Sequence, residues 1–379
     1  MIKIDPTLIT TKGPDGKSLA EKHVEWFVKT CTEEKCSWDD SKTYRDFLIE
    51  TFQLDNATFE SAIKPFLIGE KDIIEEFRKI YKKFNGVKQK PPKKENGKWI
   101  SSYSEQDKEK NALAKKIEEA FLYNYFEEPH IRESDWDAYK FCRGLNIDVC
   151  PYCNRQYIFT VAVHKKGMHK DNKKCITRPE IDHYYPKSIY PYLSCNLFNF
   201  IPSCPTCNHT KSNKDDGENN VFSLIYPYME KYGDNGVFKV KYDNSFLDSD
   251  KLFGEQLDEK KIELSIEAKG PIKNKIERSK EIFHLEDIYN MHKLDLSDFL
   301  NRYKKYCEPK RREIIKLFHD SANVNELIDD NQLEIFLRIM SSKLEKELLG
   351  MIECDENKQY PLKKMKEDIK KQLDSSNTT

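Results

Sequence analysis

The sequence has no apolar run that approaches the roughly 18 residues needed to cross a bilayer. Residues 1–5 (MIKID) also lack the basic and apolar segments of a secretory signal peptide. A glycine-rich phosphate-binding loop and an internal repeat are missing as well. We therefore expect a cytoplasmic protein that makes no membrane contact and hydrolyses no nucleotide through such a loop.

The chain also lacks an excess of positive charge. Its 64 Lys and Arg residues offset 65 Asp and Glu residues, which leaves a formal net charge of -1. The 12% of aromatic residues favours a folded protein over a disordered one, and the 34% of charged residues favours helices with hydrated outer faces. Because dedicated DNA-binding domains usually carry a basic excess, binding of nucleic acid would require a local positive surface or a partner protein.

Helical patterns flank a non-helical middle. Apolar residues spaced by three and four positions predict helices over most of 18–84, near 108–126, from Ser134 to Gly144, and from about 272 onward. Residues 85–107 hold turn signals in a polar, basic stretch, which predicts a long loop or hairpin. Strands are expected at 156–163, 176–185 and 197–202, with an accessory sheet formed by 237–242 and 261–268.

Two matched Cys-Pro-x-Cys motifs stand in this middle region. Cys150 and Cys153 form the first, Cys204 and Cys207 form the second, and about 50 residues (154–203) separate them. Each pair can place two thiolates on one side of a tetrahedral ion, whereas a redox dithiol needs only one pair. The spacing therefore predicts a closed structural Zn²⁺ site with four sulfur ligands. The other seven cysteines are expected to be reduced and mostly buried.

Between the two motifs lie the residues suited to phosphodiester hydrolysis. His183 can accept a proton from water near neutral pH, and the oxygens of Asp182 and Asn208 suit a hard ion such as Mg²⁺ or Mn²⁺. His209 is an alternative ligand to Asn208. Since neighbouring strand residues point to opposite faces, Asp182 and His183 can act together only where a strand ends.

These residues together resemble the HNH, or ββα-metal, nuclease family in its four-cysteine zinc form. The resemblance covers about 60 residues and consists of the Asp-His pair, the two zinc motifs, and an Asn that precedes C-x-x-C-N-x-x-K. It implies that His183 is the general base, that Asn199 orients the catalytic loop, and that Asn208 stands where the family name has its last His. Lys187 and Lys211 are candidate phosphate contacts.

The resemblance also implies a fold and a partner. It predicts an α+β protein in which a zinc-stapled ββα core (146–220) lies between a helical N-terminal region (1–145) and a C-terminal region (221–379) with a small sheet and helices. The start of the zinc segment and the large helical flanks are similar to HNH nucleases of bacterial anti-phage defence, of the Septu-type and retron-associated kinds. Such nucleases act beside an ATPase or a sensor subunit.

Two other functions use the same residues. One is a zinc-stapled module that binds nucleic acid or a protein without cutting, which the intact Asp182, His183 and Asn208 set disfavours. The other is an RNA-cleaving toxin of the same fold, although we favour DNA as the substrate. Basic stretches at 78–98 and 164–174 are candidate contacts to a nucleic-acid backbone.

Overall fold

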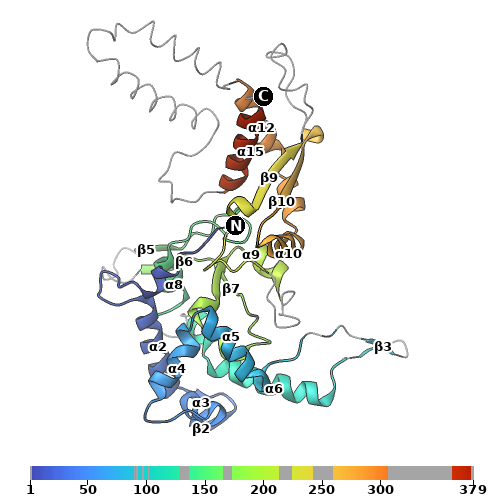
Figure 1. The fold of residues 1–379 in the computed structure, drawn as a ribbon. Coiled ribbons are helices and arrows are strands. Elements are labelled where there is room, and N and C mark those ends of the chain that lie inside the picture. Colours follow the sequence, from blue (N-terminus) through green and yellow to red (C-terminus); the bar gives the residue numbers. More distant parts are fainter. Residues whose placement is uncertain are drawn as a thin grey trace, which may run out of the picture. The chain divides into compact units, whose positions relative to one another are not determined.

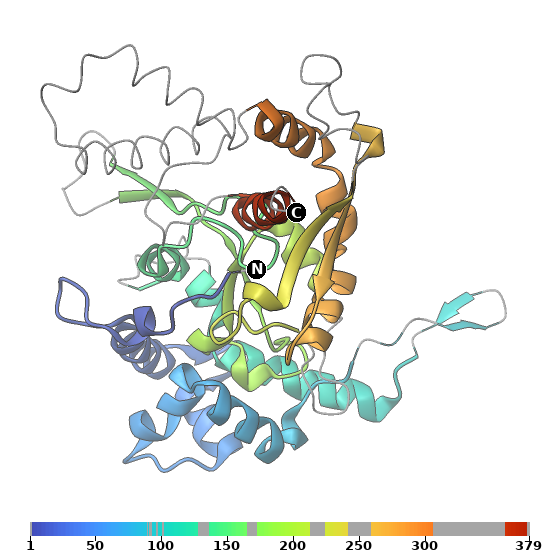
Figure 2. The ribbon, with the colours of Figure 1, turned by 45° about the horizontal axis from the view of Figure 1, so that its top comes forward.

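The computed structural model describes residues 2–88, 90, 93–95, 98–100, 102–127, 136–164, 173–212, 224–241, 259–305 and 361–376. The chain forms two compact units, Met1–Lys231 and Tyr232–Thr379. The fold is α+β, mostly helical with small two-stranded antiparallel sheets (Figures 1 and 2). Across the described ranges, no helix combines the length and apolar character that a bilayer crossing requires.

Helices dominate the first part of the first unit, as their periodic patterns predict. Ser18 caps α2 by accepting the N–H of Glu21, whose carboxylate accepts the Ser18 N–H in return. The same reciprocal capping begins α3 and α6. The elements are α1 (Thr7–Thr10), α2 (Leu19–Glu33), β1 (Lys35–Cys36), β2 (Asp39–Thr43), α3 (Tyr44–Phe52), α4 (Phe59–Ile68), α5 (Lys71–Ile80), η1 (Lys82–Phe84), β3 (Lys93–Glu95), β4 (Lys98–Ile100), α6 (Glu105–Ala120), α7 (Tyr123–Glu127) and α8 (Ala138–Leu145).

Two details of this helical region differ from the sequence-based expectation. Asp137 caps α8 by accepting the Lys140 N–H, and the expected cap Ser134 lies outside the described residues. The helix expected near 108–126 is divided into α6 and α7, because Leu122 between them has a positive φ of 60°. The expected excursion at 85–107 contains a hairpin, in which β3 pairs with β4.

The middle of the chain contains the expected strands with shifted limits. The piece at 176–185 is two strands, because Pro179, which has no N–H for a ladder, lies between them. The segment 156–163 forms only a bridge at Tyr157 before β5 begins. The elements are β5 (Val161–His164), β6 (Lys173–Thr177), β7 (Glu180–His183), η3 (Pro191–Leu193), η4 (Leu197–Asn199), β8 (Phe200–Ser203) and α9 (Pro205–Lys211).

Strands β7 and β8 form an antiparallel pair, and α9 follows β8 directly. His183 lies opposite Phe200 in this pair, and Asp182 lies opposite Ile201. Beyond β7 the chain packs against α4 through η3 and η4. The Tyr185 hydroxyl donates to Glu75 of α5 at 2.7 Å. The helical region therefore fixes the position of the chain that follows β7.

The first unit extends to Lys231. Two tyrosines of the segment 224–231 form hydrogen bonds with the chain around the start of β8. The Tyr226 hydroxyl donates to the Phe198 carbonyl at 2.7 Å, and the Tyr228 hydroxyl donates to the Phe200 carbonyl at 2.8 Å. The expected division of the chain at residues 145 and 220 stays a prediction.

The second unit contains the expected accessory sheet. Strands β9 and β10 pair antiparallel, with Gly236 opposite Ala268 and Lys241 opposite Glu263. Helices α10 and α11 pack against β10, while α15 packs against β9 (Figure 2). The elements are η6 (Gly233–Asn235), β9 (Gly236–Lys241), η9 (Glu259–Lys261), β10 (Glu263–Ala268), α10 (Lys273–Phe283), α11 (Leu285–Asn290), α12 (Lys293–Lys305) and α15 (Lys363–Ser376).

Asn196 connects the helical region to the loop before β8, and its loss should destabilise the first unit. Its Nδ2 donates to the Phe66 and Gly69 carbonyls at 3.0 and 3.1 Å, and its Oδ1 accepts the N–H groups of Phe198 and Asn199. Asn196→Ala leaves four buried groups without this partner, which costs about 3 kcal/mol. We expect the first thermal unfolding midpoint to fall by roughly 6–12 °C.

Asn111→Ala is the matched control, because the Asn111 side chain accepts a single part-buried N–H, that of Val87. Calorimetry of both variants beside the wild type provides the comparison. Equal midpoints for the two variants would show that Asn196 does not connect these segments.

Candidate metal centre and catalytic pocket

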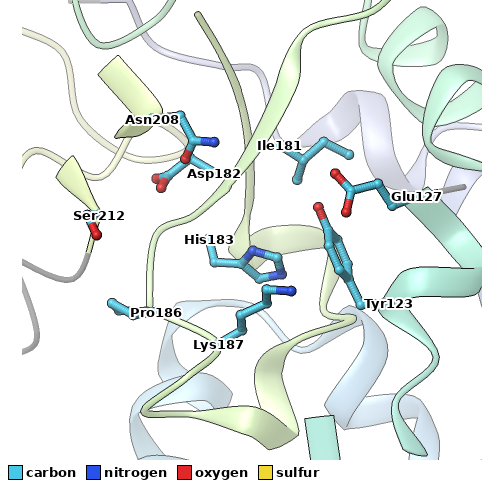
Figure 3. A pocket seen from close by; sticks show the side chains of 9 residues that line it. All are labelled: Tyr123, Glu127, Ile181, Asp182, His183, Pro186, Lys187, Asn208 and Ser212. Atoms are coloured by element: carbon cyan, nitrogen blue, oxygen red, sulfur yellow. The ribbon is translucent and has the colours of Figure 1, made fainter. Parts of the chain in front are cut away.

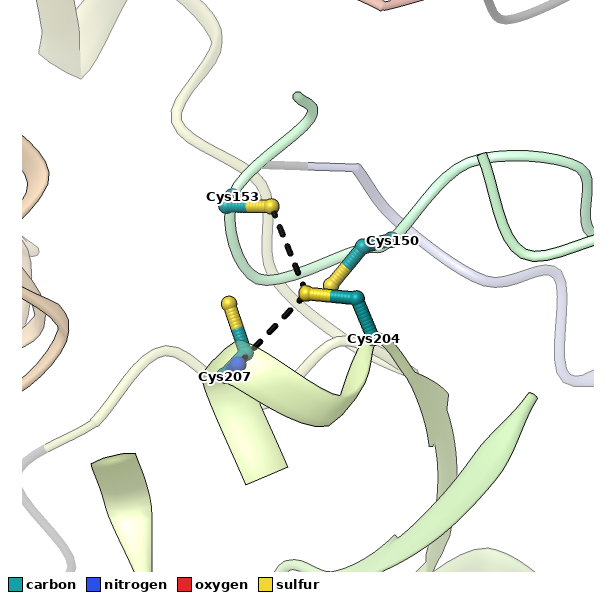
Figure 4. A group of neighbouring side chains, drawn as sticks. All are labelled: Cys150, Cys153, Cys204 and Cys207. Carbon is teal, nitrogen blue, oxygen red and sulfur yellow. Dashed lines mark hydrogen bonds between the residues drawn. The ribbon is translucent and has the colours of Figure 1, made fainter. Parts of the chain in front are cut away.

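Four buried cysteines meet at one point, as the sequence predicts. Cys150 and Cys153 lie in the turn before β5, while Cys204 caps α9 and Cys207 lies in its first turn (Figure 4). The four sulfurs lie within 4.8 Å of one another, and Cys153 Sγ is 3.9 Å from Cys204 Sγ. A tetrahedral Zn²⁺ with bonds of about 2.3 Å places its sulfurs about 3.8 Å apart. The arrangement therefore fits a Zn²⁺ ion.

The electrostatics of this cluster favour a bound cation. Burial raises the pKa of the Cys150 thiol well above its usual value. Four thiolates in so small a volume would repel one another and lose their hydration, unless a metal ion balanced their charge. The Cys207 N–H points to Cys204 Sγ at 3.5 Å, which further favours a thiolate at Cys204. With all four positions taken by sulfur, such a site is closed to substrate.

A separate cavity of about 230 Å³ lies where β7 ends (Figure 3). Asp182 and His183, the last two residues of β7, both line it, so the strand ends at the position that the sequence argument required. The other lining residues are Tyr123, Glu127, Ile181, Pro186, Lys187, Asn208 and Ser212.

Both carboxylate oxygens of Asp182 are held by buried donors. The Tyr152 hydroxyl donates to Oδ2 at 2.6 Å, and the Lys211 ammonium donates to Oδ1 at 3.0 Å. Burial and the Asp182 charge raise the pKa of Tyr152 well above its usual value, so its hydroxyl keeps the proton that it donates. A carboxylate has about four lone-pair directions, and the described residues donate to Asp182 in two of them.

His183 is fixed in one orientation. Its Nε2 lies 2.9 Å from the Ser194 carbonyl. Because a carbonyl only accepts, Nε2 must carry the proton, and Nδ1 is then the basic nitrogen. Nδ1 has no hydrogen-bond partner among the described residues. Burial, with the charges of Lys187 and Lys211 nearby, lowers the pKa of His183 to about 3, so the ring is neutral at pH 7.

Asn199 is fully buried and bonds to two points of the chain that follows this histidine. Its Oδ1 accepts the Tyr185 N–H at 2.7 Å, and its Nδ2 donates to the Tyr185 and Leu193 carbonyls, each at 3.0 Å. Leu193 precedes Ser194, whose carbonyl orients His183. The Asn199 side chain therefore holds the loop that follows His183, and it is not among the residues that line the cavity.

Asn208 lines the cavity from α9. Its Nδ2 donates to Glu180 Oε2 at 2.8 Å, which leaves the amide oxygen as the available ligand atom. His209, the alternative, is 76% exposed; its Nε2 lies 3.5 Å from the same Glu180 oxygen, and the residue does not line the cavity. The geometry thus favours Asn208 over His209 as a partner for Asp182.

The two candidate phosphate lysines lie in different environments. Lys187 lines the cavity, 2.9 Å from Glu118 and above the ring of Tyr123, with a third of its side chain exposed. Lys211 is fully buried and donates both to Asp182 and to the His183 carbonyl at 2.7 Å. A phosphate contact would require its ammonium to leave both acceptors, whereas Lys187 needs only to exchange a partly exposed ion pair.

Several residues around the cavity are not predicted from the sequence. Tyr123 and Glu127 lie one turn apart on α7 and belong to no motif, so the sequence gives no signal for them. Tyr152 occupies the variable position of a Cys-Pro-x-Cys motif, where spacing alone gives no signal. Glu180 could have been found, since it lies two residues before Asp182 and so on the same strand face.

Comparisons with known proteins found no matching family model, no matching curated protein and no matching solved structure.

Cys204→Ser should remove the metal from the four-cysteine cluster and unfold the surrounding segment, because metal binding and folding are linked at such sites. We expect about one zinc per wild-type chain and less than a tenth of that in the variant, measured by atomic emission after gel filtration.

Cys142→Ser is the matched control, since Cys142 is a buried cysteine outside the cluster. It should retain the wild-type zinc content. Equal zinc in Cys204→Ser and Cys142→Ser would contradict the assignment of the cluster.

Proposed function

We propose that this protein is a metal-dependent endonuclease of the HNH, or ββα-metal, type that hydrolyses phosphodiester bonds, with DNA favoured as substrate. The observation that carries the proposal is the fixed His183 ring beside Asp182 in one cavity. The order β7, β8, α9 and the four-cysteine cluster also support it, because the family resemblance implies these features together.

His183 is the general base of the proposed reaction. Its neutral ring has Nδ1 available to take a proton from a water in the cavity, while the Ser194 carbonyl keeps the tautomer fixed. An anionic phosphate in the cavity favours the protonated ring, so it raises the pKa of His183.

Asp182 and Asn208 are the proposed ligands of a Mg²⁺ or Mn²⁺ ion. Both supply hard oxygen atoms to the same cavity, and Asp182 retains lone pairs beyond those used by Tyr152 and Lys211. When bound, such an ion supplies positive charge to the phosphate and the leaving oxygen. Glu180 orients the Asn208 amide by accepting its N–H.

Lys187 is the proposed phosphate contact from the protein. The cavity that Lys187 lines has a volume of about 230 Å³, which is enough for a phosphate group. A contact to phosphate positions a nucleic acid without reading its bases. The role in anti-phage defence, with an ATPase or sensor partner, stays a prediction from the resemblance.

His183→Ala should lower the rate of plasmid cleavage at least about 100-fold, the scale of general-base catalysis. The measurement is conversion of supercoiled plasmid with Mg²⁺ or Mn²⁺, beside an RNA substrate at equal phosphate concentration. Zinc content should match the wild type, whereas the thermal midpoint should fall, because the variant leaves the buried Ser194 carbonyl without this partner.

His284→Ala is the matched control, because His284 is exposed and lies in the second unit. It should cut as fast as the wild type. Unchanged cleavage by His183→Ala would contradict the mechanism, and binding without cleavage by the wild type would favour a non-catalytic binding module. Cleavage of RNA alone would support the toxin alternative.

A further inference from the structure

The two chain segments that form the four-cysteine cluster both donate a hydrogen bond to the carboxylate of Asp182. Tyr152 lies between Cys150 and Cys153, and its hydroxyl donates to Asp182 Oδ2 at 2.6 Å. Lys211 ends the helix that carries Cys207, and its ammonium donates to Asp182 Oδ1 at 3.0 Å. Each chain segment that brings two sulfurs to the cluster thus also brings one donor to Asp182.

Water cannot easily replace these donors. The side chain of Asp182 is 4% exposed and that of Lys211 is fully buried, while Tyr152 is 3% exposed as a residue. A buried carboxylate that loses a hydrogen bond has few alternative partners, so it rotates or becomes less stable as an anion. The orientation of Asp182 therefore depends directly on Tyr152.

The position of Tyr152 depends in turn on the cluster. The turn that carries it is closed by the Asn154 N–H to the Cys150 carbonyl at 2.8 Å and by the Cys150 N–H to the Gln156 carbonyl at 3.0 Å. Bonds from Cys150 and Cys153 to one ion would fix both ends of the same turn. Tyr152 thus joins the turn that carries two of the sulfurs to Asp182 through a single hydrogen bond.

We propose that Tyr152 is a positioning residue for the catalytic ion, through which the zinc cluster sets the orientation of Asp182. This inference rests on the proposed function, since it assumes that Asp182 binds a divalent ion. It assigns the turn between Cys150 and Cys153 a second role, which is to orient a ligand of the neighbouring cavity for Mg²⁺ or Mn²⁺.

The test is Mn²⁺ binding by full-length Tyr152→Phe, which removes one oxygen atom and no zinc ligand. Partners that orient a ligating side chain typically change metal affinity 10–100-fold. We expect the dissociation constant of Mn²⁺, from the electron paramagnetic resonance signal of free Mn²⁺, to rise about 10-fold. Zinc content should stay at the wild-type value. Asp182→Asn defines which part of the wild-type binding belongs to Asp182.

Tyr226→Phe is the matched control. It also removes a buried hydroxyl that donates at 2.7 Å, in this case to the Phe198 carbonyl and not to Asp182. We expect it to lower the thermal midpoint as much as Tyr152→Phe does and to leave Mn²⁺ affinity unchanged. A purely structural hydrogen bond at Tyr152 would make the two variants behave alike.

The outcomes separate this inference from the proposed function. If Asp182→Asn weakens Mn²⁺ binding but Tyr152→Phe does not, Tyr152 has no positioning role, and the nuclease proposal stands. Tighter binding by Tyr152→Phe also overturns the inference, because the hydroxyl then only competes with the ion. If Asp182→Asn binds Mn²⁺ as the wild type does, both proposals fail.

Discussion

The fold of residues 150–211 depends on one constraint, which is that two distant segments bring four cysteine sulfurs together. Residues 150–153 and 204–207 come together at the cluster, and β7, β8 and the loop between them lie on the chain that joins them. A pair of four-residue strands is not stable alone in water. Closing this loop at the cluster reduces the entropy that its ordering would otherwise cost, and a bound ion supplies further free energy of folding.

The helical region supplies the second support. α5 reaches the loop after β7 through the Glu75 carboxylate and through Arg78, whose guanidinium lies over the rings of Tyr185 and Tyr190. This contact also explains why Arg78, in a basic stretch that suggested phosphate binding, is buried and unavailable to a nucleic acid. The four-cysteine cluster and α5 both fix the chain around the cavity, so its side chains have little freedom. Such rigidity suits a site whose chemistry needs fixed geometry.

Some of this arrangement could be predicted from residue order alone. The cysteine cluster follows from two matched motifs, and the position of Asp182 and His183 at a strand end follows from the two-residue period of a strand and from Pro186 beyond it. The accessory sheet follows from the alternation around Val237 and Ile266. Each of these signals is local or repeats one motif, so the spacing of residues along the chain is sufficient to predict the feature.

Other features depend on contacts between distant residues, which spacing does not encode. Nothing in the sequence near Tyr152 indicates that its hydroxyl meets Asp182, thirty positions away. Likewise Lys211 looks like a surface phosphate contact in a helical pattern, and its burial follows only from the packing of α9 on β7. The break at Pro179 could have been predicted, since proline without an N–H interrupts a strand.

We propose that one chain segment builds two metal sites, a closed sulfur site and an open oxygen site beside His183. Diffraction from a crystal grown with Mn²⁺, recorded on both sides of the zinc and manganese absorption edges, tests this proposal most directly. We expect a zinc peak among the four sulfurs and a separate manganese peak in contact with Asp182 and the Asn208 oxygen. Zinc at the sulfurs with no manganese at Asp182 would contradict it.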